Sequence, residues 1–288
     1  MERSRPRAVI SLLTDFGLRD AYVGAMKGAI ARLAPDALVI DISHEVPPQD
    51  ILSGGLLWAA AVPYFPEGSV HVAVVDPGVG TRRKVLAVEA RGCIFLAPDN
   101  GILGCVLEKR EIARCYEVRR RSLFLRPVSR TFHGRDVFAP VAARLACGLP
   151  PREVGPAAQP AVWMRVPRPR ARVRREGTET RVEERGVILA FDAFGNAITN
   201  LRPRRGFRLA RLRTGSLETR RLARTYADAE PGGAVALEGS SGYLEVAVRG
   251  GSAERELALE RGQAVAAEWR RREEPGRRAA RRQSGPTG

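Results

Sequence analysis

The sequence of 288 residues is poor in lysine, histidine and cysteine, and it contains no long apolar run. Only three of its 48 basic residues are lysine, so the net charge of +16 is carried almost entirely by arginine. Many of these arginines lie in the first seven residues, in residues 165–185 and in residues 270–282. This placement is typical of basic linkers and chain ends, so nucleic acid is not expected to be the main partner.

The apolar runs are too short for targeting or membrane segments. Residues 8–13 are shorter than the apolar region of a signal peptide, and no later run approaches the roughly 20 apolar residues of a spanning helix. Four scattered cysteines without a Cys-x-x-Cys pair argue against a disulfide framework and against a zinc site. The sequence therefore predicts a soluble, cytoplasmic protein that binds no membrane and holds no metal.

Strand and helix patterns alternate over the first half of the chain. β-branched runs predict strands, and helical spacing of apolar residues predicts helices, in the order 8–13, 20–34, 37–42, 50–64 and 70–75. Residues 85–89 and 93–96 predict a hairpin added to the same sheet. Residues 8–165 are therefore predicted to form an N-terminal α/β domain with a mainly parallel sheet flanked by helices.

The second half of the chain has a different composition. Proline and arginine dominate residues 166–185, which are predicted to be a linker. Short strand patterns separated by glycine-rich turns predict a small all-β, barrel-like C-terminal domain over residues 186–268. Residues 269–288 are rich in Arg, Glu, Gly and Pro and are predicted to be a disordered basic tail.

Four short segments place polar side chains among glycines at predicted strand ends or in loops. They cover residues 15–17, 76–83, 131–134 and 192–196. Ligands of open α/β sheets bind beyond the carboxyl ends of the strands, so Asp15 and Asp76 are well placed for binding or chemistry. An acid at the position of Asp15 can hold a ribose diol.

Each of these segments also has a purely structural interpretation, which the residues alone leave open. Asp15 and Asp76 can cap turns. Arg83 can be a surface cation, and His133 can bond to the start of a nearby helix. The segment 192–196 suits a hairpin turn.

Eight motifs in matching order carry a resemblance to a known family. They are Leu-Leu-Thr-Asp-Phe-Gly at 12–17, Tyr-Val-Gly-Ala-Met-Lys-Gly at 22–28, Asp-Ile-Ser-His at 41–44, Val-Val-Asp-Pro-Gly-Val-Gly-Thr at 74–81, Pro-Asp-Asn-Gly at 98–101, Thr-Phe-His-Gly-Arg-Asp at 131–136, Phe-Gly-Asn-Ala-Ile-Thr-Asn at 194–200 and Ser-Gly-Tyr-Leu-Glu-Val-Ala at 241–247. Together they make the chain, over roughly residues 8–265, resemble the S-adenosyl-L-methionine hydroxide adenosyltransferases, relatives of fluorinase and chlorinase.

The resemblance implies an α/β domain followed by a β-barrel domain, and a homotrimer with active sites between subunits. It also implies a hydrolase reaction. Water or hydroxide attacks C5′ of the substrate, S-adenosyl-L-methionine, and releases adenosine and L-methionine. No cofactor is expected.

The resemblance also implies roles for particular residues. The set that handles the water falls on Asp76, Arg83 and His133, where the Thr-x-Arg spacing selects Arg83 over its neighbour Arg82. Asp15 is expected to bind the ribose diol. In the halogenases an aromatic residue stands at the position of Asp76 and a tyrosine at that of His133. This chain has neither, which favours water over a halide as the nucleophile.

The remaining substrate contacts are implied in the same way. Asp192 is expected to bind the ammonium group of the methionine moiety. Phe132, Phe194 and Asn196 are expected to line the pocket with aromatic and polar groups.

The residue types fit this reaction. A sulfonium is already a good leaving group, so the main task is to align and activate a weakly nucleophilic water. The Arg83 charge is expected to keep Asp76 ionised, and His133 can accept or relay a proton near neutral pH. A halide-using adenosyltransferase, or a non-catalytic protein that binds nucleosides or anions, remains as an alternative.

Overall fold

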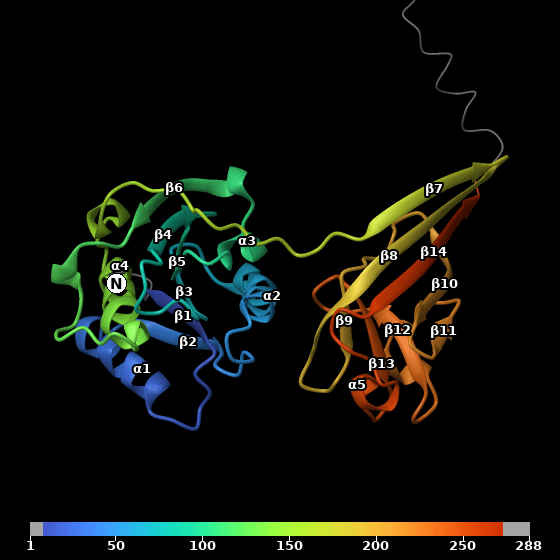
Figure 1. Ribbon diagram of the computed structural model, residues 1–288, viewed down its shortest axis with the longest axis horizontal. Coiled ribbons are helices and arrows are strands. Elements are labelled where there is room, and N and C mark those ends of the chain that lie inside the picture. The colour runs from blue at the N-terminus through green and yellow to red at the C-terminus, as the bar shows by residue number, and fades with distance from the viewer. Residues whose placement is uncertain (1–7, 273–288) are drawn as a thin grey trace, which may run out of the picture. The chain divides into compact units, whose positions relative to one another are not determined.

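The computed structural model describes residues 8–272. Its contacts divide the chain into two compact units, one up to Val166 and one from Pro167 onward, and each buries a hydrophobic core of its own (Figure 1). No helix within the described residues is long and apolar enough to cross a bilayer.

The first unit is built on a six-stranded sheet in the order β2-β1-β3-β5-β4-β6. Its strands are β1 (Val9–Thr14), β2 (Leu38–Ser43), β3 (Val70–Val74), β4 (Val85–Ala90), β5 (Cys93–Pro98) and β6 (Ile112–Glu117). The pairs β1–β2, β1–β3 and β3–β5 are parallel, and β4 joins β5 and β6 in antiparallel pairs. The predicted α/β domain with a mainly parallel sheet is confirmed.

Helices cover both faces of this sheet because its buried strands are apolar on both sides. The α-helices are α1 (Tyr22–Leu33), α2 (Ile51–Ala61), α3 (Leu103–Val106) and α4 (Ala139–Ala146). The shorter helices are η1 (Val62–Tyr64), η2 (Lys109–Glu111), η3 (Arg121–Leu123), the π-helical turn η4 (Gly134–Phe138) and η5 (Pro151–Val154). On β3, Val72 packs into the core formed with α1 and α4, whereas Ala73 packs into the core formed with α2 and α3.

The second unit is an antiparallel sheet in the order β11-β10-β14-β8-β9-β13-β12, with β7 paired to β8. Its elements are β7 (Arg170–Glu176), β8 (Glu179–Phe191), β9 (Ala197–Thr199), β10 (Arg208–Thr214), β11 (Leu217–Thr219), η6 (Tyr226–Asp228), β12 (Ala234–Glu238), β13 (Leu244–Val248), α5 (Ala253–Glu256) and β14 (Ala264–Arg272). This sheet curls into a nearly closed barrel around the apolar core, which confirms the predicted all-β, barrel-like domain.

Two predicted segment boundaries are wrong. Residues 166–185 are not a linker, since β7 and the first half of β8 form an antiparallel ladder there. Every residue of β7 is exposed. Ala171 and Val173 alternate with arginines as in a strand, but this pattern is short and stands among prolines and arginines that are typical of a linker. Residues 269–272 belong to β14, where Trp269 is buried in the core, and residues 273–288 of the predicted tail lie outside the described residues.

Candidate active site

A tight turn after β3 presents Asp76 at the carboxyl end of the parallel strands. The Val79 amide donates to the Asp76 carbonyl over 3.2 Å, and the Thr81 amide donates to the Gly78 carbonyl over 3.2 Å. Gly80 has a φ of 77°, and a Cβ there would lie 2.4 Å from the carbonyl oxygen of Arg130. Only glycine therefore allows the turn to lie this close to the loop that carries Arg130.

The turn returns the chain so that Arg83 forms a bidentate ion pair with Asp76. Arg83 Nε donates to Asp76 Oδ1 over 2.9 Å, and Nη2 donates to Oδ2. The side chains are only 8% and 4% exposed, respectively. The interpretation of Arg83 as a surface cation is thus wrong, and the neighbouring Arg82 is the exposed one.

Burial and charge act in opposite directions on Asp76. Burial raises the pKa of its carboxyl group above the ordinary value, while the charge and hydrogen bonds of Arg83 and the charge of His133 lower it. Burial is the larger effect, so the shift is opposite in sign to the one expected from Arg83 alone.

His133 lies at the start of η4, a π-helical turn, which is a rare structure often found at functional sites. Burial and the charge of Arg83 lower the pKa of its imidazole, and the charges of Asp76 and Asp136 raise it. The ring borders a hollow of about 820 Å³. The structure therefore brings His133 within electrostatic reach of the Asp76–Arg83 pair.

Asp15 directly follows β1, the strand next to β3, and β3 leads to Asp76. β1 pairs in parallel with β3, with Thr14 opposite Val74, so both acids follow adjacent strands at one edge of the sheet. Asp15 Oδ2 accepts a hydrogen bond of 2.8 Å from the backbone amide of Gln49.

Phe132 belongs to an aromatic cluster next to this edge. Its ring centroid lies 5.8 Å from that of Phe16 and 5.0 Å from that of Tyr22, both in edge-to-face geometry. The Arg135 guanidinium lies 5.0 Å from the Phe132 centroid. A Cβ at Gly134 would meet the Phe16 ring at 2.9 Å, so glycine permits this close packing.

The other predicted site residues lie in the second unit, in the turn between β8 and β9. Asp192 Oδ1 accepts from the backbone amides of Phe194 and Asn196, and Oδ2 accepts from Asn196 Nδ2, each over 2.9 Å. Phe194 is 77% exposed. The hairpin-turn interpretation of this segment therefore holds as a description of its backbone.

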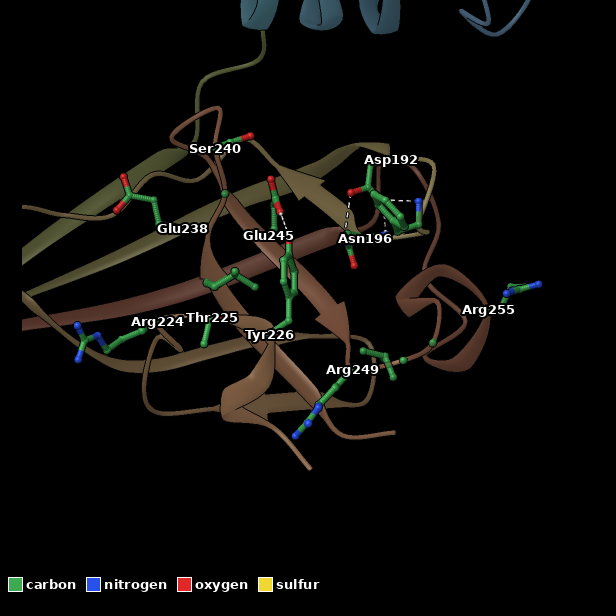
Figure 2. Close-up of a pocket in the computed structure, with 16 residues that line it drawn as sticks. Asp192, Asn196, Arg224, Thr225, Tyr226, Glu238, Ser240, Glu245, Arg249 and Arg255 are labelled. Carbon is green, nitrogen blue, oxygen red and sulfur yellow. Dashed lines mark hydrogen bonds between the residues drawn. The ribbon is translucent and has the colours of Figure 1, made fainter. Parts of the chain in front are cut away.

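This turn borders a hollow of about 880 Å³ that contains a polar pair which the sequence analysis did not assign (Figure 2). Tyr226 Oη donates to Glu245 Oε2 over 3.2 Å. Burial and the charge of Asp192 raise the pKa of the Glu245 carboxyl, and the Tyr226 hydrogen bond lowers it. The signal that could have found Glu245 is a single acid inside the otherwise apolar strand β13.

Among residues 8–272, no three His, Cys, Asp or Glu side chains cluster so that they could hold a metal ion.

Two family models match the chain over most of its length. Residues 10–155 match the N-terminal domain of SAM hydroxide adenosyltransferases, and residues 186–266 match their C-terminal domain. The chain belongs to the SAM hydroxide adenosyltransferase family. The resemblance drawn from the eight motifs is thereby confirmed.

Individual relatives of the family agree with this assignment. The chain is 42% identical over 258 residues to the (R)-S-adenosyl-L-methionine hydrolase of Salinispora arenicola, covering 87% of this chain and 94% of that one. It is 29% identical over 225 residues to a fluorinase of Actinopolyspora mzabensis, covering 70% and 74%. A crystal structure of an uncharacterized conserved protein from Thermotoga maritima is similar, with a TM-score of 0.78 and 34% identity over 90% of this chain and 99% of that one.

Proposed function

We propose that this member of the SAM hydroxide adenosyltransferase family hydrolyses S-adenosyl-L-methionine to adenosine and L-methionine. The observation that carries this proposal is the buried Asp76–Arg83 ion pair at the edge of the sheet, with His133 beside it. Relatives that are named (R)-S-adenosyl-L-methionine hydrolases are 39–46% identical to the chain over the aligned residues, whereas the fluorinase is 29% identical.

The reaction is an in-line displacement at the ribose C5′. The sulfonium leaves as neutral thioether, so no proton needs to be delivered to methionine, and the attacking water must lose one proton. Aligning the water with the C5′–S bond can lower the barrier by about 7–11 kcal/mol. In our proposal Asp76 holds and polarises the water, Arg83 fixes the carboxylate, and His133 accepts or relays the proton.

The substrate-binding roles follow the arrangement of each unit. Asp15 binds the ribose diol, and Phe132 contributes an aromatic wall. In the second unit Asp192 binds the ammonium group, and Phe194 and Asn196 line the pocket. The proposal includes a homotrimer with active sites between subunits, as the family resemblance implies, and in such an assembly a second copy could cover the exposed Phe194.

The proposal requires no metal and no cofactor, because the sulfonium substrate supplies its own leaving group. It also places the enzyme in the cytoplasm.

The origin of the new oxygen atom tests the reaction directly. Incubation with S-adenosyl-L-methionine in isotopically labelled water, with chloride or fluoride present, is expected to place the label in the 5′-hydroxyl of adenosine. Mass spectrometry of the products measures this. A 5′-halo-adenosine would instead support the halide-using alternative, and adenosine binding without turnover would support a non-catalytic nucleoside-binding protein.

The pH dependence of turnover tests the role of His133. Because burial lowers the pKa of this imidazole below 6.5, its proton-accepting neutral form persists at neutral pH. The rate is therefore expected to fall only as the pH drops below about 6.5 through this lowered pKa. His133→Gln should remove this acidic limb from the profile of kcat/KM against pH and should lower kcat by about 10²-fold.

A matched control for this variant is Arg126→Gln, which alters the same hollow without changing a proton acceptor. It should leave the position of the acidic limb unchanged. If His133→Gln keeps the limb of the unmodified enzyme, Asp76 carries the titration, since the two groups are coupled.

A further inference from the structure

A row of four polar side chains in the first unit lies next to Asp15. None of the four has a role in the proposed reaction. Lys27 Nζ lies 2.5 Å from Asp41 Oδ2, and Asp41 Oδ1 lies 3.1 Å from His44 Nε2. His44 Nδ1 lies 2.8 Å from Thr14 Oγ1. We call these four residues the His44 relay.

The Thr14 hydroxyl and the Asp41 carboxyl lie on opposite sides of the His44 ring. The Phe16 amide donates to Thr14 Oγ1 over 3.3 Å, so the hydroxyl hydrogen is free to donate to His44 Nδ1. Burial opposes ionisation of Asp41, but the nearby Lys27 and His44 outweigh it and lower the pKa of this carboxyl. The His44 ring thus lies between the Thr14 hydroxyl, 2.8 Å from Nδ1, and the Asp41 carboxyl, 3.1 Å from Nε2.

The arrangement of hydroxyl, imidazole and carboxylate resembles that of a nucleophilic triad, but burial excludes that use. Thr14 is fully buried and His44 is only 3% exposed. Neither side chain can reach a substrate atom, so the relay must act through other residues.

The residues on which the relay converges belong to the loop of Asp15. Thr14 directly precedes Asp15, and the Gly17 amide donates to the His44 carbonyl over 2.7 Å. The segment after His44 closes the same loop from the other side, because the Gln49 amide donates to Asp15 Oδ2. The side chain and the backbone of His44 thus hold both ends of the loop.

We propose that the His44 relay is a positioning device that fixes the Asp15 carboxylate for the two hydroxyls of a ribose, and so sets the preference for ribonucleosides over deoxyribonucleosides. This inference rests on the proposed role of Asp15. The Asp15 carboxylate can accept hydrogen bonds from both diol hydroxyls at once only if the orientation of its plane is fixed. A carboxylate that rotates freely about its Cβ–Cγ bond would bind a single hydroxyl nearly as well as two.

The test compares Thr14→Val, which removes the hydroxyl at nearly constant volume, with Thr14→Ser, which keeps it. Calorimetric binding of adenosine and of 2′-deoxyadenosine measures the preference. The full-length unmodified protein is expected to bind adenosine more tightly than 2′-deoxyadenosine. In Thr14→Val the ratio of the two affinities should fall about tenfold, and in Thr14→Ser it should stay unchanged. For S-adenosyl-L-methionine, Thr14→Val should raise KM and change kcat much less.

Asp41→Asn provides a second variant at a more exposed position, in case Thr14→Val does not fold. It removes the charge that orients the imidazole, and it should reduce the preference in the same direction. If either folded variant keeps the preference of the unmodified protein and only its melting temperature falls, the relay is merely structural and the inference is overturned.

The failure of the proposed function would give a different result. If the unmodified protein shows no preference between the two nucleosides and Asp15→Ala changes neither affinity, the diol role of Asp15 is wrong, and the inference is overturned with it. A preference that is abolished by Asp15→Ala but unaffected by Thr14→Val overturns the relay alone.

Discussion

Asp76→Asn is expected to lower the rate of adenosine formation by about 10²–10⁴-fold while adenosine binding changes little. Asparagine keeps the shape of the side chain and one oxygen acceptor, but it loses the negative charge that polarises the water. The neutral amide also leaves Arg83 without its carboxylate partner. Single-turnover adenosine release and calorimetric adenosine binding, measured on the same preparation, separate the two effects.

Asp76→Ala should nearly abolish adenosine release, but it also leaves a buried guanidinium unpaired, which costs about 3–5 kcal/mol of folding stability. The asparagine variant is therefore the sharper test, and Asp20→Asn, which changes an exposed acid ahead of α1, is its matched control. Turnover of the asparagine variant at the rate of the unmodified enzyme would show that Asp76 does not handle the water.

Arg83→Gln is expected to lower kcat by about 10²-fold or more, whereas Arg82→Gln should change it less than twofold. The two arginines are adjacent in sequence, but only Arg83 reaches Asp76, with two hydrogen bonds, and Arg82 is exposed. Without Arg83, burial of the Asp76 carboxyl is opposed less strongly, by the charge of His133 and a backbone hydrogen bond from Gly78, so its pKa rises further. Loss of the Arg83 charge also raises the pKa of His133, so the acidic limb of the kcat/KM profile that is assigned to His133 should move to higher pH.

Arg83→Lys completes this series. Lysine keeps the charge but cannot form the bidentate pair, so it should restore only part of the rate lost in Arg83→Gln. Equal activities of Arg82→Gln and Arg83→Gln would contradict the assignment of Arg83, and with it the Thr-x-Arg spacing on which that assignment was based.

The pairing of Asp76 with Arg83 was expected from the family resemblance, through the Thr-x-Arg spacing, whereas the residues alone left Arg83 open as a surface cation. The sequence did not predict that burial raises the pKa of Asp76 more than Arg83 and His133 lower it. This balance depends on how completely the turn is buried, and the loop that passes Gly80 comes from about 50 residues further along the chain. Contacts at that separation leave no periodic signal.

The same reasoning explains the errors in the second half of the chain. In β7 the arginines alternate with only two apolar residues, Ala171 and Val173, so the ladder with β8 identifies this segment as a strand more clearly than its sequence does. Glu245 was contained in a quoted motif, but its partner Tyr226 lies in a separate segment that shows no motif. The barrel itself was predictable because its strands and glycine turns recur at short intervals.

The parallel pairing of β1 with β3 fixes the distance between the backbone positions that follow the two strands. Neighbouring strands lie about 4.8 Å apart, and one residue advances about 3.3 Å along a strand. Thr14 lies opposite Val74, so the backbone positions of Asp15 and Asp76 differ by one strand across and one residue along. In the proposed reaction, the distance between the ribose hydroxyls at Asp15 and the attacking water at Asp76 would thus be set by the backbone hydrogen bonds between β1 and β3. These bonds do not depend on which side chains the two strands carry.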